Sequence, residues 1–209
     1  AWSVQVALEA RRHTLHMDFD FATLPTLIRE VLQLSPFEKG PRLAIEHLAS
    51  KGLFVVVQPQ LRGTRLDGAA LLDVDDRPVV GLTLRHDRVD YFWFTLVHEL
   101  VHVLRHLRVD PETIFVDDLD HCATEDQRET EADLVARDFL IPPASWARSA
   151  ASTAGTPKSV IELANELRIS PAIVAGRIRH ERKNFRILSS LVGYGNVRRH
   201  FPEVSWHAK

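Results

Sequence analysis

The stretch YFWFTLVHELVHVLRHL, Tyr91–Leu107, has the apolar composition of a buried helix, yet it carries three histidines and a glutamate. Charged and imidazole groups are costly to bury unless they have partners. The sequence HELVH places His98 and His102 four residues apart, so a helix presents both rings on one face. Glu99 directly follows the first histidine. The spacing predicts a site in which these three side chains act together.

This histidine pair has the character of a zinc site. Two neutral imidazoles and one hard ligand suit tetrahedral Zn²⁺, with the fourth position left to water. Zinc lowers the pKa of that water and polarises a carbonyl, while a neighbouring glutamate takes the proton. We therefore predict one Zn²⁺ per chain on His98 and His102, with Glu99 as the general base. A buried helix with two satisfied histidines is the alternative.

The third ligand must come from another segment. His106 continues the spacing, but it lies roughly 12 Å from His98 along the helix axis, so it is expected at the helix end or the rim. The sequence ETEAD opens a later helix in which Glu129 and Asp133 share a face. Glu129 can be the ligand, and Asp133 can orient a ligating histidine through its other ring N–H. An acidic helix N-terminus is the alternative.

The rest of the chain alternates between helix and strand patterns. Apolar spacing predicts helices, and β-branched runs bounded by turn residues predict strands. SPFE, Ser35–Glu38, has the form of a capping box. Asp75 and Asp76 are expected to turn a hairpin. The expected helices cover 22–34, 41–50, 91–107, 129–141 and, as a helix–turn–helix, 159–181, and the expected strands lie in 53–57 and 68–85.

These elements predict an α+β fold, with a small, mostly antiparallel sheet packed by helices. The sequence ASTAGTP, 151–157, is the best linker candidate. It divides the chain into a sheet-containing domain at 1–150 and a helical, basic subdomain at 151–209. The second helix of the latter begins with Pro171, Ala172 and Ile173, too apolar for a helix that reads DNA. We therefore expect it to be structural.

Composition favours a soluble globular protein, with 45% apolar and 26% charged residues among 209. No apolar run is long enough to cross a membrane, and the N-terminus lacks a signal-peptide pattern. The single cysteine, Cys122, excludes an internal disulfide and favours a reducing cytoplasm.

The sequence FTLVHELVHVLRH, followed later by ETEADLVARDFLIP, resembles the ImmA/IrrE family of zinc metallopeptidases. The resemblance covers about 53–142 and implies a zincin-like core, with zinc on His98, His102 and Glu129 and with Glu99 as the base. It also implies cleavage of a helix-turn-helix repressor, which switches on a stress, mobile-element or defence operon. Val101 departs from the family, where glycine is common, and leaves the ligands intact.

The acidic loop before Glu129 contains two further candidates. A thiolate is a strong zinc ligand, so Cys122 could take the position of the water and keep the enzyme latent. A semi-buried cysteine without a role is the alternative. His121 could stabilise the oxyanion of the reaction, as could Tyr91 or Arg85.

The C-terminal segment mixes basic residues with aromatic ones, a combination suited to single-stranded nucleic acid. Single-stranded DNA would be a natural signal for a protease that answers DNA damage. A basic helix with solvated charges is the alternative. The candidate contacts are Arg179, Arg182, Lys183, Arg186, Arg198 and Arg199.

A peptide substrate is expected to add a strand to a sheet edge, for which VVGLTLR, 79–85, is the candidate. A different class of function is a transcription regulator or antitoxin component that keeps the fold but works by binding. Glu99 favours the enzyme, because a binding protein needs no general base. A zinc hydrolase of small molecules is the weakest possibility.

Overall fold

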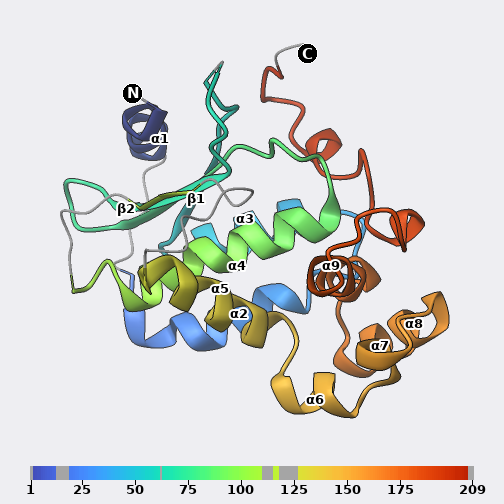
Figure 1. Cartoon of the computed structure of the whole chain (residues 1–209). Helices are drawn as coiled ribbons and strands as arrows, with labels where there is room; N and C mark the ends of the chain where they lie inside the picture. The colour runs from blue at the N-terminus through green and yellow to red at the C-terminus, as the bar shows by residue number, and fades with distance from the viewer. Residues whose placement is uncertain (1, 13–18, 62, 110–114, 118–126, 207–209) are drawn as a thin grey trace.

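The fold is built on a mixed sheet. The computed structural model describes residues 2–12, 19–61, 63–109, 115–117 and 127–206 (Figure 1). Within them the strand order is β1-β3-β2-β4; β1 and β3 are parallel, and β2 is antiparallel to both β3 and β4. The sheet is therefore mostly antiparallel, as predicted. The strands are β1 (Phe54–Val57), β2 (Gly68–Leu72), β3 (Pro78–Leu82) and β4 (Phe115–Asp117).

Helices surround this sheet, which confirms the predicted α+β class. None of the helices in the described ranges combines the length and the apolar character that crossing a membrane requires. The helices are α1 (Trp2–Arg11), α2 (Leu24–Leu32), α3 (Gly40–Ser50), α4 (Val89–Arg105), α5 (Gln127–Leu140), α6 (Pro143–Arg148), α7 (Ala150–Thr153), α8 (Pro157–Leu167) and α9 (Pro171–Glu181).

Successive side chains along each strand point to opposite faces of the sheet, so they belong to two separate hydrophobic cores. Val55, Ala70 and Val80 join the large core around α4, whereas Val56 and Val79 point to a smaller core under α1. Figure 1 shows α1 and α4 on opposite faces of the sheet. The alternation therefore fixes which face of the sheet covers α4.

Helix α4 is the centre of the large core. Of its 17 residues, 12 are buried, including His98, Glu99 and His102 of HELVH. The helix packs against β2 and β3 on one side and against α2, α5 and α9 on others. Surroundings so well packed hold the backbone of α4 in one position, which a site needs from its scaffold.

Two local predictions are wrong. The capping box expected at Ser35 does not form: α3 begins only at Gly40, and the Ser35 hydroxyl accepts from the Ser170 N–H at 2.9 Å. A capping box occurs instead at Thr156, before α8. The strand expected at the sheet edge, β3, is internal, because β1 pairs with its free side. In the described part of the sheet, β1 and β4 are the outer strands.

The C-terminal helices share the large core. Ile173, Val174 and Ile178 of α9 are buried, and a Cβ on Gly176 would lie 2.8 Å from Asp90 Cβ of α4. Helix α9 is therefore packed on α4, in keeping with the structural role expected for it. The boundary at residue 150 stays a prediction.

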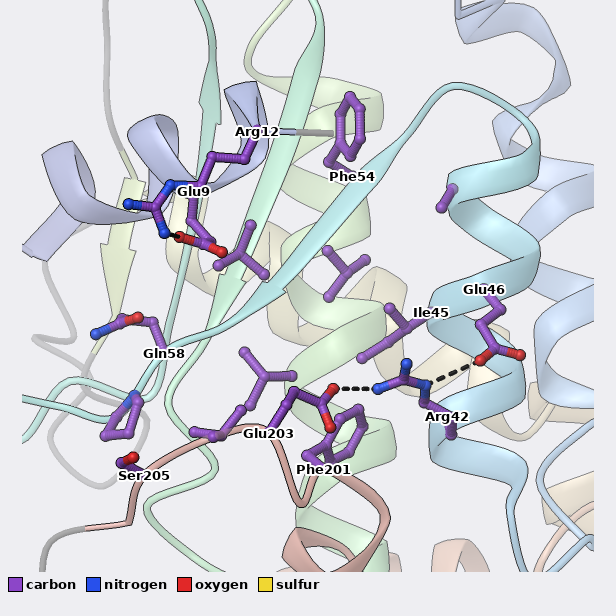
Figure 2. A pocket seen from close by; sticks show the side chains of 16 residues that line it. Glu9, Arg12, Arg42, Ile45, Glu46, Phe54, Gln58, Phe201, Glu203 and Ser205 are labelled. Carbon is purple, nitrogen blue, oxygen red and sulfur yellow. Dashed lines mark hydrogen bonds and ion pairs between the residues drawn. The ribbon is translucent and has the colours of Figure 1, made fainter. Parts of the chain in front are cut away.

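A groove of about 790 Å³ follows β1 on the side away from β3 (Figure 2). It lies between the end of α1, α3 and the segment 201–205. Its charged side chains are paired with one another: Arg12 with Glu9, and Arg42 with both Glu46 and Glu203. The groove thus offers an apolar floor with little uncompensated charge.

Candidate metal centre

Helices α4 and α5 bring three metal-binding side chains together. His98 and His102 are fully buried, and Glu129 reaches them from the first turn of α5. The Nε2 atoms of the histidines are 3.0 Å apart, and the Glu129 carboxylate oxygens lie 3.2 Å from His98 Nε2 and 3.4 Å from His102 Nε2. Ligands of a tetrahedral Zn²⁺ are roughly 3.3 Å apart at the usual bond lengths. The three residues therefore fit such an ion.

The other ring nitrogen of His98 is bonded to α5. Asp133 Oδ1 lies 3.0 Å from His98 Nδ1. A carboxylate there favours the tautomer that carries its proton on Nδ1, so that Nε2 keeps its lone pair for a metal. Asp133 thus stands where the sequence placed an orienting residue, one helical turn after Glu129.

His102 has a different partner. His106 Nδ1 lies 2.9 Å from His102 Nδ1, and His106 Nε2 lies 3.5 Å from Glu131. His106 is the C-cap residue of α4, which agrees with the expected position at the helix end or the rim, and it is buried, with 6% of its surface exposed. Burial, and then the neighbouring His102, lowers the pKa of His106. A neutral His106 can accept the His102 Nδ1–H while its own Nε2–H points to Glu131.

Replacing His106 by alanine is expected to weaken zinc binding by about 10–100-fold, because it removes the group that holds the tautomer of His102. Competition with a chromophoric chelator measures this affinity directly, without reference to activity. The matched control is His47→Ala, which removes a histidine from the surface of α3, where it pairs with Glu30. Equal zinc affinity in His106→Ala and wild type would contradict the orienting role.

Glu99 lies against a glycine of the sheet. A Cβ added to Gly68, the first residue of β2, would lie 2.1 Å from Glu99 Oε1. Gly68 is not among the glycines with positive φ, so only the space taken by Glu99 disfavours a side chain there. The close approach to the backbone of β2 limits where the fully buried Glu99 carboxylate can lie. Gly68 therefore positions the side chain of Glu99, the candidate base.

Gly68→Ala is expected to lower kcat roughly 10²-fold, the usual consequence of moving a reacting group by about 1 Å. Zinc content should stay unchanged, since no ligand is touched. Gly81→Ala is the matched control in the neighbouring strand, where a Cβ would lie 2.6 Å from the Trp2 ring instead. That variant should lose stability but keep its kcat. Equal kcat in Gly68→Ala and wild type would show that Gly68 does not position Glu99.

The remaining polar residues near β2 form a network around Asp67. Arg85 donates two hydrogen bonds to its carboxylate, at 2.9 and 2.7 Å, and the Tyr91 hydroxyl donates a third at 2.9 Å. The network joins the start of β2 to the start of α4. A role for Tyr91 or Arg85 at the oxyanion stays a prediction, as do those of His121 and Cys122, which lie outside the described residues.

The basic residues predicted to contact nucleic acid are not all on the surface. Arg179 is only 1% exposed, and its guanidinium bonds the Phe185 carbonyl and the Tyr194 hydroxyl, so the prediction is wrong for this residue. Arg198 donates to the carbonyls of Leu84 and Arg85. These two side chains stabilise the C-terminal segment.

The other four basic candidates are exposed. Arg182 donates to the Thr153 carbonyl, and Arg199 pairs with Glu38. Lys183 and Arg186 lie just beyond α9. For these four, and for the partly exposed Arg198, a nucleic-acid contact stays a prediction.

The arrangement of these side chains is compatible with metal-assisted hydrolysis. A divalent cation held by the three candidate ligands would supply Lewis acidity to a carbonyl and to water. Glu99, next to His98 in the chain, can accept the proton of the attacking water. The sequence named these four residues as candidates. It carried no signal for the contact of Gly68 with Glu99, whereas the spacing of four residues was a signal for the contact of His106 with His102.

Comparison with known proteins places the chain in a family. No curated protein matches it. A family profile described as the IrrE N-terminal-like domain matches residues 60–179, more than half of the chain. The matched region contains both HELVH and Glu129, so it includes the whole metal-binding group. The chain therefore belongs to the IrrE N-terminal-like domain family of metallopeptidases.

Proposed function

We propose that the protein is a zinc-dependent endopeptidase. The observation that carries the proposal is the group of His98, His102 and Glu129, together with the buried Glu99 next to His98 in the chain. Two imidazoles and one carboxylate are a usual ligand set of catalytic zinc, which keeps an open position for substrate. Oxygen-rich sites, by contrast, suit Mg²⁺ or Ca²⁺.

Three elements of the fold, α4, α5 and β2, supply the side chains that would bind the metal, orient its ligands and accept the proton. Helix α5 provides Glu129 as the ligand and Asp133 as the group that fixes His98. Helix α4 provides the two histidines and the base, and β2 confines that base through Gly68. Burial of the site excludes bulk water and so strengthens electrostatic interactions with the reacting groups.

We propose further that the substrate is a helix-turn-helix repressor and that its cleavage switches on a stress, mobile-element or defence operon. The support for this substrate is the resemblance of HELVH and ETEADLVARDFLIP to the repressor-cleaving peptidases. A DNA-damage signal such as single-stranded DNA is proposed as the trigger. The exposed bases Arg182, Lys183, Arg186 and Arg199 are its candidate contacts.

Co-expression with the helix-turn-helix protein encoded beside it tests the function. We expect the repressor to be cut by wild type but not by Glu99→Gln, with the fragments identified by mass spectrometry. The test is repeated after DNA damage, so that a latent enzyme is detected. Loss of repression by both proteins without any cleavage would instead support the rival function, a transcription regulator or antitoxin component that acts by binding.

A further inference from the structure

A second cavity lies beside the metal centre. Its volume is about 650 Å³, and α4, the C-terminal half of α5 and α9 enclose it. Figure 1 shows α5 and α9 both next to α4. We call it the α5–α9 cavity. Its apolar walls include Phe94, Leu140, Ile141 and Ile173. A cavity of this size and polarity accommodates a short peptide segment.

Two of the residues that line the cavity also contact His98. Asp133 lines it while bonding His98 Nδ1 at 3.0 Å. Phe94 also lines it, and its ring centroid is 6.1 Å from that of His98. None of the three ligands lines the cavity, but Asp133 and Phe94 place it beside the His98 ring, so a peptide bound at the metal can reach it by continuing past this ring.

Most charged groups around the cavity are already paired. Arg88 donates to Asp90 at 3.0 Å, and Arg177 donates to Glu181 at 2.8 Å and to a backbone carbonyl. Arg137 differs, because its guanidinium has no hydrogen bond or ion pair with any residue in the described ranges. The side chain is only partly exposed. Arg137 thus places a permanent positive charge, with no direct ion-pair partner in the described ranges, on a wall that otherwise combines apolar side chains with charges that are mostly paired.

We infer that the α5–α9 cavity binds an acidic side chain of the substrate and that Arg137 determines this specificity. The inference rests on the proposed function and adds a substrate preference to it. A glutamate suits the cavity best, since its methylenes can contact the apolar walls while its carboxylate accepts charge-assisted hydrogen bonds from the guanidinium. The other two arginines that line the described part of the cavity, Arg88 and Arg177, already have acidic partners.

The position of Arg137 also limits where that acidic residue stands in the substrate. Arg137 follows Glu129 by eight residues on α5, roughly 12 Å along the helix axis. Side chains lean toward the helix N-terminus, which shortens the distance to the metal. An extended peptide advances about 3.3 Å per residue. The acidic residue is therefore expected about two to four residues from the scissile bond.

Cleavage-site profiling with a peptide library from a digested bacterial proteome tests the preference. We expect wild type to enrich Asp and Glu at one position within about four residues of the cut. For a cleaved peptide and its Glu-to-Gln counterpart, kcat/KM should differ by roughly tenfold in wild type. The difference should vanish in Arg137→Leu and favour a lysine peptide in Arg137→Glu. Arg11→Leu, which removes an exposed arginine from α1, should behave as wild type.

A Glu/Gln ratio in Arg137→Leu equal to that of wild type overturns the inference. So does a preference that disappears when the peptide C-terminus is amidated, because a terminal carboxylate would then be the ligand. Binding is measured separately on Glu99→Gln with a labelled, blocked alanine decapeptide that carries one glutamate, and with its glutamine counterpart. Equal affinities overturn the inference whether or not peptides are cleaved. Absence of all cleavage by wild type, by contrast, contradicts the proposed function.

Discussion

Replacing Glu99 by glutamine is expected to lower kcat for peptide cleavage by about 10²–10⁴-fold, the usual contribution of a general base. The amide keeps the size of the carboxylate, so the packing against Gly68 should persist. The amide cannot accept a proton from the attacking water. The substitution therefore removes the general base and leaves the folded structure unchanged. Zinc content and melting temperature should therefore match those of wild type. Turnover of a cleaved peptide, measured beside metal analysis, separates the two effects.

The control for this experiment is Glu162→Gln, which makes the same change on the exposed face of α8. It should leave kcat unchanged. A Glu99→Gln protein that cleaves as fast as wild type would contradict the role of Glu99 as base. A variant that loses both zinc and activity would show instead that Glu99 contributes to metal binding.

The metal-binding group could be predicted because its geometry is local. His98 and His102 are one turn apart, and so are Glu129 and Asp133, so the helical repeat alone brings each pair to one face. That the two faces meet is a tertiary fact. The carboxylates at the start of the later helix made Glu129 a candidate, and the resemblance to a family that pairs these two helices supported it.

The contacts of the site that were missed are long-range. Gly68 precedes Glu99 by 31 positions, and their contact depends on how β2 packs against α4. His106 lies too far from His98 along the helix axis to be a third ligand. The spacing of four residues nevertheless brings its ring into contact with that of His102. Arg179 looked like a surface base because its neighbours in sequence are basic. Its burial depends on how the segment around Tyr194 folds over α9.

The fold was predicted where apolar patterns are strong. The hairpin of β2 and β3 and the helices α2 and α4 follow from such patterns. Strand β4 was missed, because three residues within an acidic loop show no alternation. Helix α1 was missed because it buries only three residues, Trp2, Val6 and Ala10. Such short or weakly amphipathic elements depend on the sheet they pack against.

The purified protein is expected to hold about one zinc per chain, and His98→Ala is expected to lose the metal and all peptide cleavage. His98 contributes one of three donor groups, whose atoms lie within 4.8 Å of one another. Removing it leaves two ligands, too few for a tetrahedral site that must keep one position open. His47→Ala, which changes an exposed histidine paired with Glu30, should keep both zinc and activity.

Removal of zinc from wild type by a chelator should also lower the melting temperature. A ligand that binds only the folded state stabilises it by about 4 kcal/mol when present at 1,000 times its Kd. Without the cation, the partly buried Glu129 carboxylate loses the positive charge that would offset the cost of its burial. Calorimetry before and after chelation, with zinc restored at the end, measures this stabilisation. Because His98→Ala lacks the site, its melting temperature should not respond to zinc; a response equal to that of wild type would mean that the metal binds elsewhere.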